Sequence, residues 1–214
     1  MRPPSPVNDS TSTGLLDAAR AADPVAWERL VDLYGRLVLY WCRRAGLEEA
    51  DRADVFQDVF RTVYCQLHQF QKNRPQDSFR AWLRTVTRHK IIDHLRSQTR
   101  HAMAHGGSEA LTRLQSVEDP LAETDALPAQ SVEERELLLR HALEMVRAEF
   151  EPRTWQAFWR TPADGIATHV VAEELGMSLV AVRKAKSRVF QRLRLCFVDA
   201  EDLESLWESG GSNG

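Results

Sequence analysis

Apolar residues recur every three or four positions along most of this chain, which is the spacing of one face of an α-helix. The pattern begins at Leu15. Asp23 and Pro24 then form a typical helix start, because Asp caps free backbone N–H groups and Pro tolerates the first helical position. Gly46 favours the end of the same helix. Its inward positions are Trp27, Leu30, Val31, Tyr34, Leu37, Val38 and Trp41.

Two further helices are predicted before the helical spacing of apolar residues is interrupted. The second runs from about Glu48 to Phe70, and the third runs from Phe79 to about Arg96. Residues 71–78 between them are polar and contain Pro75, which predicts a loop. The apolar stripe of the second helix is Val55, Phe56, Val59, Phe60, Val63, Tyr64 and Leu67. The inward positions of the third are Trp82, Leu83, Val86, Ile91, Ile92 and Leu95.

Helical spacing resumes at Val132 and continues to about Val198, with breaks near Pro152 and over residues 161–165. No segment alternates apolar and polar residues as a half-buried strand does. The pattern therefore predicts an all-α fold. It consists of two small helical domains, an N-terminal helical bundle and a C-terminal helix-turn-helix domain, joined by a flexible linker.

The predicted domain boundaries follow changes in composition. Residues 1–14 are rich in Pro, Ser and Thr and are expected to be disordered. Residues 15–100 and 132–198 form the two domains, and residues 101–131, with their Gly and Pro, form the linker. Residues 199–214 form an acidic tail. The tail either adds an amphipathic turn that packs on the second domain, which is the favoured interpretation, or is an interaction segment.

Composition narrows the class of protein only slightly. The chain has 214 residues and a formal net charge of -3, so its overall charge does not indicate nucleic-acid binding. Cys42, Cys65 and Cys196 are an odd, scattered set, which argues against a disulfide framework and for a reducing compartment. The N-terminus lacks the apolar core of a signal peptide, and no apolar run is long enough to cross a bilayer. We therefore expect a cytoplasmic protein.

The distribution of charge is more informative than its sum. Residues 72–100 carry eight Lys or Arg and two acids, and residues 179–194 carry six Lys or Arg and no acid. Residues 109–136 carry eight acids and two arginines. Two basic helices thus flank an acidic linker. Solvated helix faces would explain such runs, but one basic helix in each predicted domain favours contact with nucleic acid.

Residues 168–194 have the layout of a helix-turn-helix. Thr168 is expected to cap the first helix, Gly176 permits a left-handed turn, and Ser178 is expected to cap the second helix. The second helix presents basic and hydroxyl side chains opposite its apolar stripe, as a helix in a major groove does. An ordinary helical hairpin with a basic surface is the alternative. The inward positions are Val171, Ala172, Leu175, Met177, Val182, Ala185, Val189 and Leu193.

Three segments, in this order, resemble the extracytoplasmic-function (ECF) sigma factors of bacterial RNA polymerase. Asp51-Arg-Ala-Asp-Val-Phe-Gln-Asp-Val-Phe60 and Phe79-Arg-Ala-Trp-Leu-Arg-Thr-Val-Thr-Arg-His-Lys-Ile-Ile-Asp-His-Leu-Arg96 resemble sigma region 2. The helix-turn-helix resembles sigma region 4. The resemblance covers about residues 15–100 and 132–198, and the linker lacks the extra domain of larger sigma factors.

The resemblance implies an all-helical protein that binds core RNA polymerase and promoter DNA. It implies binding to the -35 element as duplex DNA and to the -10 element as single-stranded DNA, with one flipped base held by the protein. An anti-sigma factor is a further possible partner. The implied polymerase-binding residues are Asp51, Asp54, Gln57, Asp58 and Arg61. The implied -10 residues are Lys72, Asn73, Arg74, Gln76, Asp77, Ser78, Arg80, Arg84, Arg88 and His89. The candidate -35 residues are Ser178, Arg183, Lys184, Lys186, Ser187 and Arg188.

Two positions depart from the family pattern. Many members carry Asn where this chain has His89. The common Thr-Val-Lys-Ser-Arg opening of the recognition helix reads Ala181-Val-Arg-Lys-Ala185 here. The helical scaffold is kept at both places, but the base preference of the family does not carry over to this chain.

Other function classes have weaker support in the sequence. No phosphate-binding loop, cofactor motif or nucleophile–base set is recognisable, so neither a cofactor nor an enzymatic activity is predicted. Cys65 and His68 lack a second metal-binding pair, so no metal site is predicted. The alternatives are a helix-turn-helix regulator that binds DNA without polymerase and, less favoured, an enzyme with a helical lid.

Overall fold

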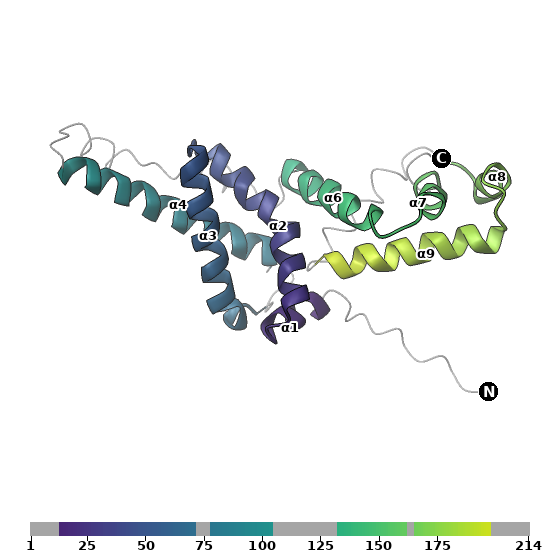
Figure 1. Ribbon diagram of the computed structural model, residues 1–214, viewed down its shortest axis with the longest axis horizontal. Helices are drawn as coiled ribbons and strands as arrows, with labels where there is room; N and C mark the ends of the chain where they lie inside the picture. Colours follow the sequence, from purple (N-terminus) through teal and green to yellow (C-terminus); the bar gives the residue numbers. More distant parts are fainter. Residues whose placement is uncertain (1–12, 72–77, 105–131, 162–164, 198–214) are drawn as a thin grey trace. The chain divides into compact units, whose positions relative to one another are not determined.

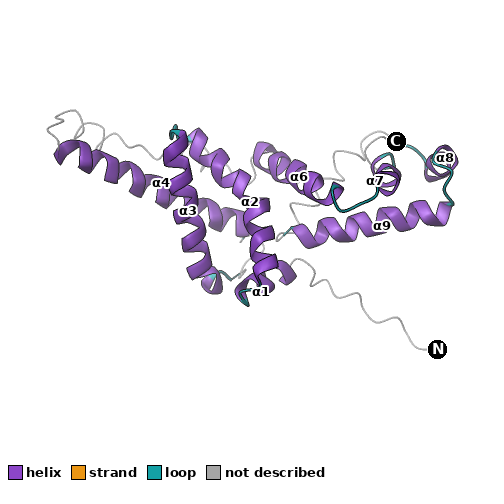
Figure 2. Ribbon diagram, viewed as in Figure 1, coloured by secondary structure: helices purple, strands orange, loops and turns teal. Residues whose placement is uncertain are grey.

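The computed structural model describes residues 13–71, 78–104, 132–161 and 165–197 (Figure 1). Within these ranges every regular element is a helix and no strand is present (Figure 2). The all-α prediction is therefore confirmed. None of the described helices is long and apolar enough to span a membrane.

The chain divides into two compact units by its internal packing. One unit contains Met1–Leu33 together with Arg135–Gly214, and the other contains Tyr34–Glu134. Their boundaries fall inside two helices, α2 (Pro24–Arg44) and α6 (Val132–Arg147). This division follows packing alone, and the functional domains drawn from the sequence remain a prediction.

Helix α2 begins and ends as its sequence predicts. It follows the short helix α1 (Thr13–Arg20), and the Asp23 carboxylate accepts hydrogen bonds from the backbone N–H groups of Val25 and Ala26, at 2.8 and 3.2 Å. After its last residue the chain reverses at Gly46, whose φ of +75° lies in the left-handed region that favours glycine.

The second and third predicted helices differ in detail from the structure. The second is α3 (Glu49–Gln66) followed by a short 3-10 turn, η1 (Leu67–Gln69), rather than one helix to Phe70. The third is α4 (Phe79–Ala104), which continues well past Arg96. Tyr64 is 57% exposed and does not belong to the buried stripe of α3, because α4 covers the other side of that helix.

The core of the Tyr34–Glu134 unit is built around aromatic rings. Phe79, at the first position of α4, is fully buried, with its ring centroid 4.9 Å from that of Tyr34 and 5.7 Å from that of Phe70. Trp82 packs at 5.6 Å from Phe79 and is half-buried, which agrees with a core role. The first turn of α4 is therefore held by edge-to-face aromatic contacts with α2 and with the end of η1.

The other unit contains the three C-terminal helices α7 (Pro152–Trp159), α8 (Thr168–Glu174) and α9 (Leu179–Cys196). Pro152 occupies the first turn of α7, as the predicted break indicates. A small apolar core joins the three helices, and all the predicted inward positions of α9 are buried in the unit. The core residues are Ala157, Val171, Ala172, Val182 and Ala185, with Ile166, Leu175 and Met177 packed against them.

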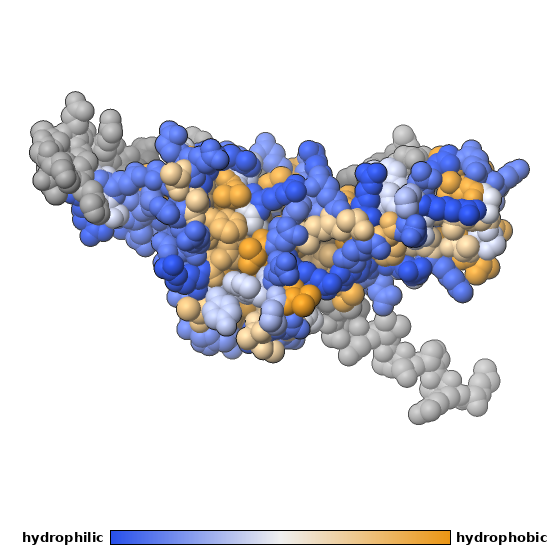
Figure 3. Space-filling model, in the orientation of Figure 1, coloured by the Kyte–Doolittle hydropathy of each residue, from blue (hydrophilic) through white to orange (hydrophobic). Residues whose placement is uncertain are grey.

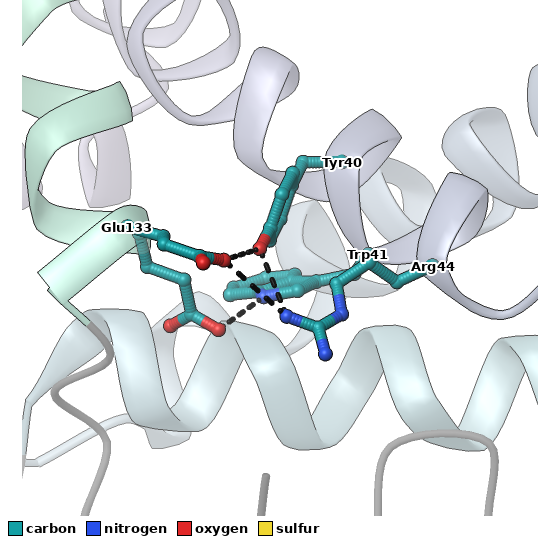
Figure 4. Close-up of polar contacts among 5 residues, drawn as sticks. Tyr40, Trp41, Arg44 and Glu133 are labelled. Atoms are coloured by element: carbon teal, nitrogen blue, oxygen red, sulfur yellow. Dashed lines mark hydrogen bonds and ion pairs between the residues drawn. The ribbon is translucent and has the colours of Figure 1, made fainter.

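Polar contacts attach the first residues of α6 to α2 within the Tyr34–Glu134 unit (Figure 4). The indole Nε1 of Trp41 donates a hydrogen bond to the buried carboxylate of Glu134, at 2.8 Å. The Tyr40 hydroxyl donates to Glu133 at 2.7 Å, and Arg44 lies 3.4 Å from the same carboxylate oxygen. Burial and the hydrogen bond to Glu133 raise the pKa of Tyr40. The acidic start of α6 thus has specific partners, which periodicity could not reveal.

The three thiols differ in environment, which predicts their reactivity. Burial raises the pKa of Cys42 to about 11 and also raises the pKa of Cys196, whereas Cys65 is exposed on α3. At about pH 8 we expect Ellman's reagent to modify Cys65 quickly and the two buried thiols after unfolding in guanidinium. The variant Cys65→Ser should lose the fast phase, and a fast phase that persists in it would contradict the buried placement.

Candidate functional site

The exposed face of α3 carries most of the side chains that sequence analysis assigned to polymerase binding. Asp54, Gln57, Asp58 and Arg61 are all exposed, on the side of the helix away from Val55, Val59 and Val63. Arg61 donates a hydrogen bond to Asp58, one turn earlier, at 3.1 Å. The result is a polar, mainly acidic surface over an apolar stripe.

Asp51 lies at the edge of this face, is half-buried, and is engaged by α4. Its carboxylate is 3.0 Å from Nε2 of His94, and Gln98 lies one turn further along α4. A hydrogen bond from Gln98 is the largest cause of a lowered pKa for Asp51, His94 adds to it, and partial burial opposes both. Asp51 therefore helps to join α3 to α4, and its predicted contact with polymerase stays a prediction.

Three of the ten predicted -10 residues lie at the start of α4. Ser78 caps the helix by accepting a hydrogen bond from the N–H of Ala81 at 3.1 Å, and it is buried. Arg80 and Arg84 are also buried, at 4% and 7% exposure, so the structure places them in the packing of α4 rather than on an open surface. Lys72, Asn73, Arg74, Gln76 and Asp77 lie outside the described residues.

Basic side chains further along α4 are more accessible. Arg88 is half-buried and His89 is exposed, and Arg96 and Arg100 are exposed as well. His89, Arg96 and Arg100 are spaced by seven and four residues, so they fall on one face of the helix. The visible surface along α4 is mainly hydrophilic (Figure 3). Arg96 and Arg100 were not among the predicted contacts, although this helical spacing was available to identify them.

The turn between α8 and α9 has a defined geometry. Gly176 has a φ of +57°, which confirms the predicted left-handed turn, and the N–H of Met177 donates to the carbonyl of Ala172 at 2.8 Å. Ser178 caps α9 as predicted, because its hydroxyl accepts a hydrogen bond from Ala181 at 3.1 Å. The prediction for Thr168 is wrong, since the residue before α8 is Ala167 and no side chain caps it.

An arginine of α7 supports the same turn. The guanidinium of Arg153 donates hydrogen bonds to the carbonyl oxygens of Leu175 and Gly176, at 2.5 and 2.6 Å. These two oxygens follow the end of α8, where helical partners are missing. Arg153 therefore positions α9 relative to α8. Sequence reasoning missed this role, because no spacing rule connects residues that are more than twenty positions apart.

The face of α9 opposite its apolar stripe is basic. Arg183, Lys184, Ser187 and Arg188 are exposed, and Lys186 is half-buried. The guanidinium of Arg188 lies 5.8 Å from the ring centroid of Phe150, a cation–π distance that engages this side chain within the unit. Arg183, Lys184 and Ser187 are therefore the most accessible of the predicted -35 residues, while Ser178 contributes its hydroxyl to the helix cap.

Residues 30–101 match the family model for Sigma-70 region 2. The matched segment extends from Leu30 in α2 to His101 near the end of α4, about a third of the chain. It contains the acidic face of α3, the Asp51 contact and the basic face of α4. Among curated proteins, none matches the chain.

The match supports a sigma-70 family RNA polymerase sigma factor. Sigma factors are non-enzymatic subunits that give RNA polymerase its promoter specificity, and region 2 supports a role in promoter recognition and in melting of the -10 element. In the part of the chain that the structure describes, no group of three or more His, Cys, Asp or Glu side chains is arranged to hold a metal ion.

The lowered pKa of Asp51 predicts a pH-dependent contribution to stability. Because the folded-state pKa lies below the ordinary value of 3.8, the contribution is present above about pH 4 and is lost as the pH falls through the folded-state pKa. Asp51→Asn should lower the free energy of unfolding at pH 7 by at most about 1 kcal/mol, since the pair is partly exposed.

Urea unfolding of both proteins between pH 7 and pH 3 measures this effect. The difference between the wild-type chain and Asp51→Asn should shrink below about pH 4. Asp54→Asn, an exposed neighbour on α3, is the matched control and should show little difference at any of these pH values. An Asp51 effect that stays constant down to pH 3 would contradict the ionic contact with α4.

Proposed function

We propose that this chain is a sigma factor of the ECF type, which recruits core RNA polymerase to specific promoters and helps to melt the -10 element. The observation that carries the proposal is the sigma-70 region 2 match over α2, α3 and α4. A second, basic helical part follows in the order that the ECF resemblance requires. The intervening segment of residues 105–131 is short for an additional domain, which favours the ECF type.

Polymerase is the proposed partner of α3. Asp54, Gln57 and Asp58 form an exposed polar surface that DNA phosphates would repel, so a protein partner suits this surface better than nucleic acid. The surface lies on a regular helix whose opposite face is buried, and it therefore requires little rearrangement on binding. Arg61 adds one positive charge to the same contact.

The -10 element is the proposed ligand of α4 and of the segment before it. Melting exposes bases at a cost of a few kcal/mol, and contacts with the displaced strand must offset this cost. Arg96 and Arg100 supply exposed positive charge along α4, Arg88 adds a half-buried guanidinium, and the exposed ring of His89 adds hydrogen-bonding groups. Lys72, Asn73, Arg74, Gln76 and Asp77 remain the proposed base and backbone contacts. Ser78, Arg80 and Arg84 then act mainly by holding the start of α4 in place.

Duplex DNA at the -35 element is the proposed ligand of α8 and α9, acting as a helix-turn-helix. The capped start of α9 brings Arg183, Lys184 and Ser187 to an open surface, where they suit base edges and phosphates in a major groove. The turn at Gly176, supported by Arg153, sets the angle between the two helices. An anti-sigma factor is a further partner that the ECF resemblance implies for this chain.

Binding to core polymerase tests the assignment most directly. The double variant Asp54→Ala/Gln57→Ala should bind purified bacterial core polymerase about tenfold more weakly, a loss of about 1.4 kcal/mol. The matched control is Glu49→Ala/Gln66→Ala, which removes one acid and one glutamine from other exposed positions of α3 and should bind normally.

Run-off transcription from a genomic fragment library, with purified core polymerase, provides the functional readout. The wild-type chain should direct initiation at a specific set of start sites. A chain that binds DNA alone but neither co-purifies with core polymerase nor supports initiation would be a helix-turn-helix regulator instead. That result, combined with no effect of the Asp54/Gln57 variant, would overturn the proposal.

The role of α9 is tested by removing equal charge at two places on the helix. Lys184→Ala should reduce transcription from promoters that depend on the -35 element about threefold to tenfold, and binding should become less sensitive to salt. Arg194→Ala removes the same charge in the last turn of α9, ten residues from Lys184, and should have little effect. Equal losses in both variants would indicate general electrostatic attraction rather than a reading face.

A further inference from the structure

A cleft of about 470 Å³ lies between α6 and α7, and all the residues that line it belong to the unit that contains Arg135–Gly214. Trp155 and Trp159 form one side of it, with nearly parallel rings whose centroids are 6.0 Å apart. Trp159 is 39% exposed. Large aromatic side chains that remain open to solvent around a concave surface commonly mark a binding site.

The opposite side of the cleft is positively charged. Arg140 and Arg147, two turns apart on α6, are exposed and line it, with Glu144 between them. Arg160 also lines the cleft, where it forms an ion pair with Glu174 of α8. The open charge of the cleft is therefore mainly that of Arg140 and Arg147. An aromatic surface beside two arginines fits a peptide in which acidic residues alternate with large apolar ones.

The chain itself contains a segment with this composition. Residues 199–208 hold five acids and no Lys or Arg. Three large apolar residues, Leu203, Leu206 and Trp207, are interspersed among the acids. The segment therefore offers both features that the cleft requires, negative charge for the arginines and apolar side chains for the tryptophans.

The end of α9, to which this segment is attached, is connected to the cleft by a contact between side chains. Arg192 of α9 donates two hydrogen bonds to Glu149, one of them at 2.6 Å, and Glu149 follows the cleft residue Arg147 by two positions. The last described residue, Phe197, lies about 7.5 Å further along the chain at helical rise. Six extended residues beyond it span up to about 20 Å, enough to bring Leu203 to the cleft.

We propose that residues 199–208 bind in the cleft between α6 and α7 of the same molecule. The acids face Arg140 and Arg147, and Leu203, Leu206 and Trp207 cover the rings of Trp155 and Trp159. Any other ligand of this surface must then compete with the segment. The inference does not depend on the assignment of α9 to promoter DNA.

Hydrogen exchange of the full-length chain tests this contact. Backbone amides of peptides covering residues 140–160 should exchange about threefold faster in Leu203→Ser/Leu206→Ser/Trp207→Ser. Glu201→Lys/Asp202→Lys/Glu204→Lys should have the same effect, because it places positive charge against the arginines. The matched control is Glu118→Lys/Asp119→Lys/Glu123→Lys, which reverses three acids at other positions of the sequence and should leave exchange in residues 140–160 unchanged.

Two results would overturn the proposal. Unchanged exchange in residues 140–160 for both tail variants would show that the segment does not occupy the cleft. A protective effect that depends on protein concentration between about 1 and 100 μM would assign the cleft to the tail of a second copy. Peptides from α9 report on general stability in the same spectra, and equal acceleration there would indicate loss of stability rather than loss of a local cover.

Discussion

The packing of α4 against α3 determines which polar side chains of the segment matched to sigma-70 region 2 can meet a partner. Helices α3 and α4 are in contact, and apolar residues of both, such as Val59, Leu83 and Ile91, are almost completely buried. Each such side chain contributes about 1.5–3 kcal/mol relative to an exposed position, so the orientation of the helices about their axes is strongly constrained. Once this orientation is set, Asp54 and Gln57 face outward and Asp51 faces α4.

The same constraint divides the basic residues of α4 into two groups. Arg80 and Arg84 come from the part of the helix that lies at the aromatic cluster around Phe79, and they are buried. Arg96 and Arg100 come from the part that extends beyond this packing, and they are exposed. The net charge of α4 therefore overestimates the positive charge that nucleic acid can reach. Most of the accessible positive charge lies in the C-terminal half of the helix.

In the unit that contains α7, α8 and α9, small residues allow close helix packing, which fixes the orientation of α9. Ala157, Ala172 and Ala185 meet in its core, so α7, α8 and α9 approach closely. Gly176 makes the turn, Ser178 caps α9, and Arg153 binds the carbonyl oxygens that the turn leaves open. The reading face proposed for α9 is thus fixed by backbone geometry and short-range hydrogen bonds rather than by its charged residues.

Local pattern alone determined the helical class, most helix boundaries, the buried stripe of α9, the Gly176 turn and the Ser178 cap. These features depend on residues within a few positions of one another, where helical geometry and capping chemistry apply. It also identified the acidic surface of α3, because Asp54, Gln57 and Asp58 share one face by spacing alone.

Tertiary structure decided the features that need contacts between distant residues. The pairing of Trp41 with Glu134, the engagement of Asp51 by His94 and the support of Gly176 by Arg153 are examples. It also decided that Tyr64 is exposed and that Arg80 and Arg84 are buried. The physical reason is that periodicity predicts which face of a helix is apolar, whereas the exposure of a polar side chain depends on which neighbouring helix reaches it and how far that helix extends.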